Sequence, residues 1–284
     1  MALKTRTEEA AHVAQYIQVV LKHVEKWRAP SNPGDPDRDS EVWFRGHSKN
    51  THSLTPSALR GNWDHESMFN RFMAVGAGAI VPAPNTIWSW YFAAQHYELP
   101  TRLLDWTEDA LTAMFFALRG MVNDDHKIDD RDPKTPPCVW VMDAGTLNAL
   151  SYGEDEVVVP LDGAWFTKHW LPGGIKQKPT EIKGANGRKT KYTNKNPIAI
   201  WPARSTPRIV AQAGSFTVHG VSRTPIEDLF WKTKGNQGDH LVRIDLTDPK
   251  RMERELVDLG MCRLRLFPEL NNVAGRLRHL YTRP

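Results

Sequence analysis

Residues 41–48 read EVWFRGHS, an apolar run that ends in an arginine, a glycine and a histidine. The run VWF is β-branched and aromatic, which predicts a strand. Two interpretations of the arginine that follows are open. Arg45 forms an ion pair with a carboxylate such as Glu66 or Asp105, or it offers a fork of N–H donors to a phosphate or carboxylate ligand. In the second case Gly46 lets the ligand approach the backbone.

On either side of this strand, helices and strands alternate without regular βαβ spacing, which indicates an α+β fold. Helices are predicted at 6–27, 63–75, 87–97, from an N-cap at Thr107 onward, at 249–259 and at 267–281. Strands are predicted at 42–45, 103–106, 138–143, on both sides of a turn at 213–214, and at 240–246. The strands 42–45, 103–106, 138–143 and 209–218 are expected to share one core, with Arg45 and Asp105 facing a common cleft.

Composition places the chain among ordinary globular proteins. Of its 284 residues 40% are hydrophobic, enough for a sizeable core, and eleven are tryptophan. The net charge of +4 permits an anionic partner. Cys138 and Cys262 lie far apart, outside any CxxC motif, so both are expected to be buried, reduced thiols. No apolar run reaches the length of a membrane span, and we expect a cytoplasmic protein with no membrane partner.

A basic segment interrupts the second half of the chain. Residues 168–195 contain eight Lys or Arg and one acid, with few apolar residues. Such a segment either tracks the phosphate backbone of DNA or RNA or is a solvated loop. The candidate nucleic-acid contacts are Lys176, Lys178, Lys183, Arg188, Lys189 and Lys191.

Other polar residues near 105 suggest chemistry. His96 and Asp105 could pair as a general base, or each could satisfy the end of its own element. Arg102 could reach an anion such as a bound cofactor, or Asp109. Acids at 105, 108 and 109 keep a metal-dependent nuclease open, although acids are common where a helix begins and no HxH or HExxH spacing supports a metal.

Four segments occur together in an order that resembles the FRG domain, a bacterial family named after its Phe-Arg-Gly motif. They are WFRGH (43–47), QHYELPTRLLDWT (95–107) with the helix ALTAMFFAL behind it, RIVAQAGSF (208–216) and GMCRLRLFPEL (260–270). LPTRLLDWT is the most specific of these motifs. The resemblance implies an N-terminal helix at 1–30 and an FRG domain over 40–280, with the basic segment as an insert.

The same order is similar to that of ADP-ribosyltransferases. In that fold a first strand ends in aromatic-Arg-Gly and its arginine holds a phosphate or ribose of NAD. A second strand ends in Ser-Thr-Ser and leads into an Ala-x-x-Phe-Ala helix, and a third motif sets a glutamate before a strand–turn–strand. FRG (44–46), LDWT (104–107) with AMFFA (113–117), and IVAQAGSF (209–216) correspond to these elements.

This second resemblance implies two small packed β-sheets with NAD, as a substrate, in the cleft between them. Arg45, Gly46, Thr107 and Phe216 would contact the NAD, and no metal is implied. Two departures matter. Asp105 replaces the first serine, and Arg208 stands near the place of the glutamate that steadies the cation formed as nicotinamide leaves.

The role of that glutamate would fall to Asp105, alone or with His96, or to Gln212 or Glu269. The sequence therefore predicts an ADP-ribosyltransferase-like enzyme that modifies a nucleic acid or a protein, or hydrolyses NAD. The alternatives are a non-catalytic nucleic-acid or nucleotide-binding module and, with less support, a metal-dependent nuclease.

Overall fold

A seven-stranded mixed sheet forms the centre of the computed structural model. The structure describes residues 6–29, 40–119, 134–160, 167–175, 181–183, 189–191, 194–232 and 236–282. The strands, in their order across the sheet, are β1 (Thr7–Ala10), β9 (Leu241–Leu246), β4 (Cys138–Asp143), β2 (Val42–His47), β3 (Leu103–Thr107), β8 (Gly214–Val218) and β7 (Ile198–Ile200). β1 runs parallel to β9 and the other neighbours are antiparallel. A separate hairpin joins β5 (Glu181–Lys183) and β6 (Lys189–Lys191).

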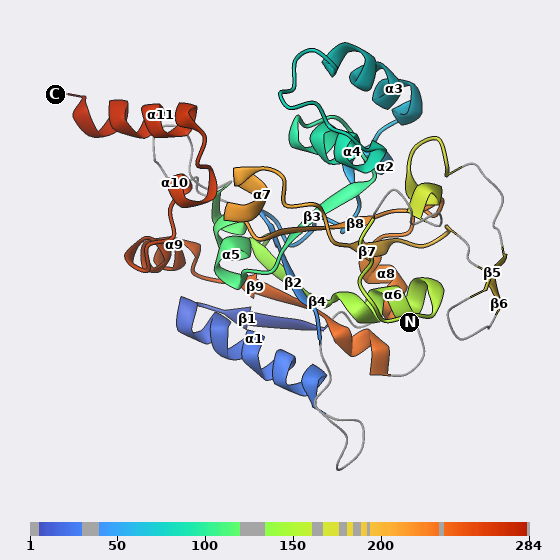
Figure 1. Ribbon diagram of the computed structural model, residues 1–284. Coiled ribbons are helices and arrows are strands. Elements are labelled where there is room, and N and C mark those ends of the chain that lie inside the picture. Colours follow the sequence, from blue (N-terminus) through green and yellow to red (C-terminus); the bar gives the residue numbers. More distant parts are fainter. Residues whose placement is uncertain are drawn as a thin grey trace.

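Helices surround this sheet (Figure 1). They are α1 (Val13–Arg28), α2 (Ser57–Arg60), α3 (His65–Gly76), α4 (Ile87–His96), α5 (Ala110–Arg119), α6 (Ala144–Tyr152), α7 (Pro207–Ala211), α8 (Ile226–Lys232), α9 (Pro249–Asp258), α10 (Arg263–Leu266) and α11 (Leu270–Tyr281), with 3-10 turns η1 (Thr167–Trp170) and η2 (Asn236–His240). The mixed character is as predicted, but the prediction of two small packed sheets is wrong. None of the helices in the described residues is long and apolar enough to cross a membrane.

The sheet is nearly divided between β2 and β3. β2 pairs with β4 over six residues, and β3 pairs with β8 over five. β2 and β3 share only the pair Phe44–Thr107. The two strands therefore part after one residue, and the sheet consists of two halves that meet at that pair. The predicted segments 42–45, 103–106 and 138–143 and the second half of 209–218 therefore belong to one sheet, although they do not share a single core.

Each face of the sheet has its own apolar core. On one face, α1, α5 and α9 pack against the inward side chains of β2, β4 and β9. On the other face, α6 and α8 cover Trp43 and Trp140, which are buried. α3 and α4 pack over β7 and β8, and Figure 1 shows this helix pair at the opposite end of the molecule from α1.

Gly46 lets helix α5 lie directly on β2. A Cβ atom at this position would stand 2.0 Å from the carbonyl oxygen of Ala113 and 2.5 Å from the amide nitrogen of Ala117. Both atoms belong to the helix backbone, which cannot give way as a side chain can. The absence of a side chain at 46 is thus explained by helix packing, and the predicted role of Gly46 in clearing a ligand's approach is not needed to account for it.

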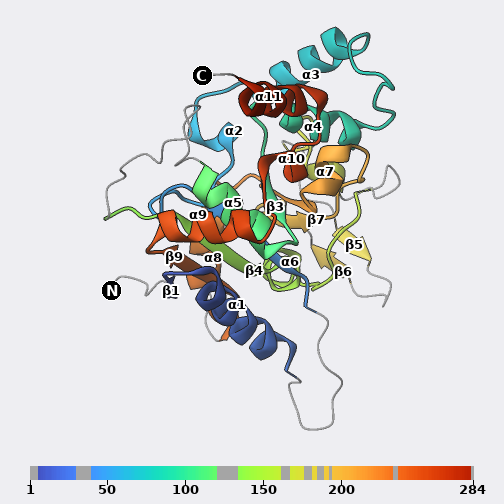
Figure 2. The same ribbon diagram turned by 90° about the vertical axis from the view of Figure 1, so that its left-hand side faces the viewer.

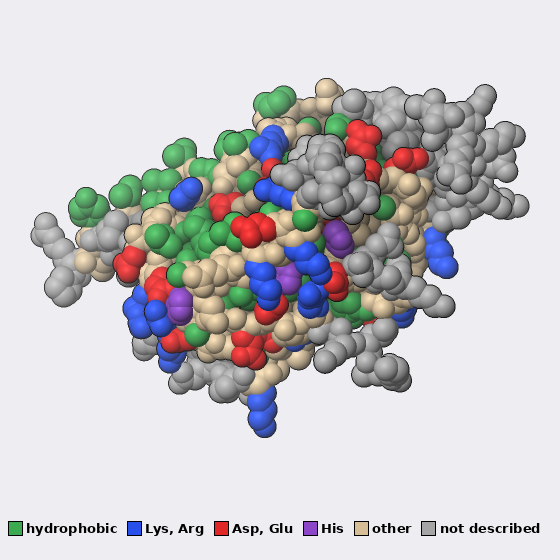
Figure 3. Space-filling model, turned by 90° about the horizontal axis from the view of Figure 1, so that it is seen from below, with side chains coloured by type: hydrophobic (Ala, Val, Ile, Leu, Met, Phe, Trp, Pro, Cys, Tyr) green, Lys and Arg blue, Asp and Glu red, His purple; other side chains and the backbone are tan. Residues whose placement is uncertain are grey.

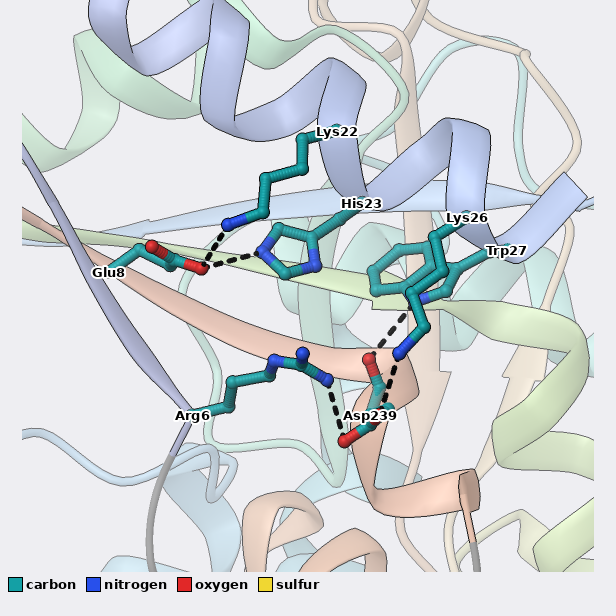
Figure 4. Close-up of polar contacts among 7 residues, drawn as sticks. All are labelled: Arg6, Glu8, Lys22, His23, Lys26, Trp27 and Asp239. Atoms are coloured by element: carbon teal, nitrogen blue, oxygen red, sulfur yellow. Dashed lines mark hydrogen bonds and ion pairs between the residues drawn. The ribbon is translucent and has the colours of Figure 1, made fainter.

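The N-terminal segment belongs to the same sheet. Residues 7–10 form a strand, so the predicted helix from residue 6 is wrong at its start, because the free edge of β9 offers these residues hydrogen bonds. Asp239 then fixes the helix, as Figure 4 shows: its carboxylate binds Arg6 at 2.6 Å and Lys26 at 2.8 Å, and its carbonyl accepts from the indole of Trp27.

Three further predictions are corrected by local contacts. Residues 207–211 form a helix where a strand was predicted, because the Thr206 side chain caps it and Pro207 suits its first turn. Asp109 caps α5, because its carboxylate accepts the N–H groups of Leu111 and Thr112, while the hydroxyl of the predicted cap Thr107 accepts the N–H of Asp109 at 3.0 Å. Cys138 is buried as expected, whereas Cys262 is exposed, and both are free thiols.

The first prediction concerns the packing of α5 on β2. Gly46→Ala is expected to lower the free energy of unfolding by on the order of 3 kcal/mol, because the new methyl group would collide with helix backbone. Gly78→Ala is the matched control, since a Cβ there meets nothing within 4 Å. Urea denaturation of both variants measures the difference. Equal stability of the two variants would contradict the packing explanation.

The second prediction concerns Glu227 in α8. Burial raises the pKa of this carboxyl group to about 7, although the N–H of Leu54 donates to it at 3.0 Å. Between pH 4.5 and 7 the folded protein thus keeps a proton on Glu227, whereas in the unfolded chain, where the pKa of this group is 4.5, the proton is released. The contribution of this protonation to the free energy of unfolding is fully present below pH 4.5 and is lost as the pH rises through 7. The loss amounts to about 3 kcal/mol.

Glu227→Gln is expected to remove this loss, because the amide stays neutral at every pH. The stability difference between parent and variant, followed by urea denaturation from pH 4.5 to 8, should therefore move in favour of the variant. Asp258→Asn, at an exposed carboxylate at the end of α9, should leave the parent's profile unchanged. A parallel profile for Glu227→Gln would show that Glu227 is ionised in the folded protein throughout.

Candidate functional site

A cavity of about 1330 Å³ opens where β2 and β3 part. Its wall is built from β2, β3 and β8, the loop before α4 and the end of that helix, the last turn of α5, and α7. It is larger than most small-molecule sites, which measure about 300–1,000 Å³. Among the described residues, the charged ones in its wall are four arginines and two carboxylates, a difference of +2: Arg45, Arg60, Arg119, Arg208, Glu98 and Asp105. The wall therefore favours an anionic ligand.

Arg45 bridges the two strands at the point where they part. Its Nη1 donates to the backbone carbonyl of Asp105 and lies 3.7 Å from the carboxylate of the same residue. Its Nε donates to Nε2 of His47 at 3.0 Å. Its Nη2 has no hydrogen-bond partner among the described residues. The predicted common cleft of Arg45 and Asp105 is confirmed, and it leaves one edge of the guanidinium free for a ligand.

His47 holds Arg45 as a neutral ring. Its Nδ1 faces the carbonyl oxygen of His52 at 3.2 Å, so this nitrogen carries the proton and Nε2 accepts from Arg45. Burial, followed by the nearby charge of Arg45, lowers the pKa of His47 to about 2. Burial also lowers the pKa of Arg45, an effect that Asp105 opposes and Arg60 adds to. The contact between His47 and Arg45 is thus unchanged across neutral and mildly acidic pH.

Asp105 is exposed to the cavity but does not pair with His96. Its Oδ2 accepts from Nε2 of Gln95 at 2.9 Å, and Gln95 in turn accepts from Thr101. Of the two alternatives for His96 and Asp105, the structure does not show the pair, because Gln95 in α4 binds the Asp105 carboxylate instead. The Asp105 side chain is 57% exposed, which leaves its second oxygen accessible.

His96 lies in the cavity wall on the side of α7. Burial lowers its pKa, with a further contribution from the charge of Arg208 and an opposing one from Glu269. Its ring is 5.1 Å from that of Tyr97, and both residues line the cavity. His96 is therefore neutral at pH 7, and the charged side chain that affects it most is Arg208.

Three other predicted residues line the cavity and also support it. The hydroxyl of Thr107 donates to the carbonyl of Gln212 at 2.6 Å, and the Gln212 amide donates to the carbonyl of Leu266 at 3.0 Å. Phe216 stacks on Phe92 with ring centroids 5.2 Å apart and is buried. Their side chains shape the wall, and the Thr107 hydroxyl and the Gln212 amide nitrogen already have partners.

Arg102, predicted to contact a cofactor, is not among the residues of the cavity wall. It is 9% exposed, and its guanidinium donates to the carbonyl of Gly220 and to His65. It therefore fixes the chain after β8. The predicted nucleic-acid contacts Lys176, Lys178 and Arg188 lie outside the described residues. For the other three, Lys183, Lys189 and Lys191, the side chains are outside the description and the backbone forms the hairpin β5–β6.

Sequence reasoning missed four residues of this site. His47 adjoins the FRG motif, and Gln95 belongs to the QHYELPTRLLDWT segment, so both carried a signal. Arg60 and Arg119 stand at the ends of short helices, where a basic residue is common for reasons unrelated to a ligand. In the part of the chain that is described, no group of three or more His, Cys, Asp or Glu side chains is arranged to hold a metal ion.

Comparison with protein families identifies residues 40–126 as a match to the FRG domain. The resemblance predicted from WFRGH and LPTRLLDWT is thus confirmed for the segment that carries β2, β3 and α5. Comparisons with curated proteins and with solved structures gave no match.

The third prediction tests the charge balance of the cavity. Asp105→Asn removes a negative charge close to Arg45 and keeps an oxygen that can accept from Gln95. It should tighten the binding of inorganic pyrophosphate about three- to tenfold, by about 1 kcal/mol, because a charge pair near a protein surface is screened by water. Isothermal titration calorimetry measures this.

Asp258→Asn, at an exposed carboxylate at the end of α9, is the control and should change nothing. If Asp105→Asn bound pyrophosphate more weakly than the parent, the anion would not lie beside Arg45.

Proposed function

We propose that the cleft of this FRG-domain protein binds NAD and that the protein acts as an ADP-ribosyltransferase-like enzyme. The observation that carries the proposal is the position of Arg45, held across the gap between β2 and β3 with one edge of its guanidinium free. Arginine presents a planar fork that fits a phosphate or pyrophosphate with two parallel hydrogen bonds. Arg60 adds positive charge beside it.

The arrangement of the three motif-bearing strands supports this proposal. β2 carries FRG, β3 carries LDWT and leads into α5, and β8 begins within the AQAGSF segment. These strands are consecutive in the sheet, and residues of all three line one cavity. Segments that correspond to the three ADP-ribosyltransferase motifs thus meet at one place, as a shared NAD site requires.

Asp105 is the carboxylate best placed to act in the reaction. In ADP-ribosyl transfer the bond between the ribose C1′ and the nicotinamide nitrogen breaks, and its electron pair leaves with nicotinamide. The acceptor oxygen or nitrogen then bonds C1′ and loses a proton. The accessible oxygen of Asp105 would steady the positive charge on the ribose and take that proton. His96 and Gln212 line the same wall, and they would position substrate.

The acceptor would be a nucleic acid, a protein or water. A second candidate function, nucleotide binding without catalysis, is favoured by Arg208. This residue lines the cavity near the place where the resemblance expects a glutamate, and its guanidinium lies 4.8 Å above the ring of Phe267. An arginine there would hold a phosphate but would not steady a cation.

The fourth prediction separates a ligand role of Arg45 from a structural one. Arg45→Ala should weaken NAD binding by on the order of 1.5–3 kcal/mol, about 10- to 150-fold, and abolish any nicotinamide release. The ion pair with the exposed Asp105 is worth only about 0–1 kcal/mol, so the variant should stay folded. Arg45→Lys keeps the charge without the fork and should also lose most of the affinity.

The measurements are NAD titration, a melting curve, and chromatographic detection of free nicotinamide with DNA, RNA or cell lysate as acceptor. Arg204→Ala is the matched control, because Arg204 pairs with Glu108 at 2.7 Å and does not line the cavity. Binding of NAD without release of nicotinamide would favour the non-catalytic function. An Arg45→Ala protein that binds NAD like the parent would overturn the assignment of Arg45.

A further inference from the structure

Three arginines from three different elements surround one buried ring. The guanidinium carbons of Arg119, Arg208 and Arg263 lie 4.5, 4.8 and 5.8 Å from the ring centroid of Phe267. Arg119 ends α5, Arg208 lies in α7 and Arg263 begins α10. α10 contacts α7 and α11, and Figure 2 shows these helices grouped together. We call these three side chains the Phe267 arginine cluster.

The positive charge of this cluster is weakly balanced. Neither Arg119 nor Arg208 makes an ion pair with any of the described residues, and Arg263 binds the neutral side chain of Asn272 at 3.1 Å. Burial lowers the pKa of Arg119, and the charges of Arg263 and Arg208 lower it further, while Glu98 opposes them. Three like charges held together in this way favour an anion beside them.

In the N-terminal region the basic side chains near the sheet are paired with acids. In Figure 4, Arg6 and Lys26 share Asp239, and Lys22 binds Glu8 at 3.1 Å. Figure 3, which views the molecule from below Figure 1, shows basic and acidic side chains interspersed across that face. The Phe267 arginine cluster departs from this pattern, because no acid among the described residues forms an ion pair with Arg119 or Arg208.

The cluster is distinct from the group around Arg45. The charges that act on Arg45 are those of Asp105 and Arg60, whereas those that act on Arg119 are Arg263, Arg208 and Glu98. Arg45, Arg60, Arg119 and Arg208 nevertheless line one cavity. The cavity thus has two separate cationic regions, and its volume exceeds what one small molecule needs.

An exposed aromatic ring accompanies the cluster. Tyr97 lines the cavity and is 59% exposed, an unusual degree for a tyrosine in a cavity wall. Its ring lies 5.1 Å from that of His96, which is itself close enough to Arg208 to be affected by its charge. Cationic side chains that take phosphates and an aromatic face that stacks on a base are the two features that bind single-stranded nucleic acid.

We propose that the Phe267 arginine cluster binds the phosphates of a single-stranded nucleic acid, with a base of that strand stacked on Tyr97. Nucleic-acid binding stands on these contacts alone, and a role of this strand as the acceptor of ADP-ribose rests on the proposed function. The site lies at the cavity and does not require the basic insert at 168–195, where the sequence places the contact.

The test measures binding of fluorescently labelled 12-nucleotide single-stranded DNA and RNA by anisotropy at several salt concentrations. In Arg119→Gln/Arg208→Gln the affinity should fall at least tenfold, and the slope of log K against log salt should decrease by about 1.4, since each phosphate contact contributes about 0.7 on a single strand. Arg119→Lys/Arg208→Lys should retain most of the affinity, because it keeps both charges. Tyr97→Ala should weaken binding without changing the salt slope.

Two comparisons make the test specific. Arg251→Gln/Arg254→Gln removes two exposed charges from α9, away from the cavity wall, and should match the parent. The Arg45→Ala variant should lose NAD but bind the oligonucleotide like the parent. Failure of NAD binding in the parent would therefore count against the proposed function and leave nucleic-acid binding standing.

Three results would overturn the proposal. The first is no binding by the parent, or equal binding by parent and cluster variant with both folded by melting curve. The second is that a mononucleotide or inorganic phosphate binds as tightly as the oligonucleotide. The third is that polyglutamate of similar charge binds as tightly, which would mean that the cluster selects charge alone.

Discussion

The parting of β2 from β3 after a single residue pair is the feature on which the rest of the site depends. When two antiparallel strands diverge, backbone groups that would have paired across the ladder lose their partners, and a buried unpaired group is costly. Here the carbonyl of Asp105 receives the guanidinium of Arg45 in place of a strand amide. The Arg45 side chain therefore bridges the two strands where they part, and it lines the cavity that opens there.

Neighbouring elements fix the separation of β2 from β3. Side chains alternate along β2, so that Phe44 and position 46 face α5 while Arg45 and His47 face the other way. Because α5 lies directly on Gly46, β2 cannot present its other face to this helix. Arg45 therefore points away from α5 and reaches β3. On the other side of the gap, Gln95 at the end of α4 ties down the Asp105 carboxylate. Helix packing and one amide thus set the geometry of both charged groups.

Much of this could be predicted from local sequence. The runs at 42–45, 103–106 and 138–143 are strands because they are apolar and bounded by breakers, and the meeting of Arg45 with Asp105 followed from their motifs. Other features depended on partners far along the chain. Residues 7–10 are a strand only because β9 has a free edge, and His96 is displaced from Asp105 by its own neighbour Gln95. The cluster on Phe267 joins positions 119, 208 and 263, and no local pattern connects them.

The charge distribution of the cavity is difficult to explain by stability alone. A fold gains little from arginines that repel one another, and local rules of this kind are broken most often at functional sites. In the N-terminal region the same residue types are matched with Asp239 and Glu8. At the cavity, Asp105 opposes the charge of Arg45 while Arg60 adds to it, and Glu98 alone opposes the two arginines that act on Arg119. An anion bound at either region would supply the missing charge, so the arginines that cost stability in the free protein become favourable in the complex. By this argument each cationic region is explained by a ligand of its own.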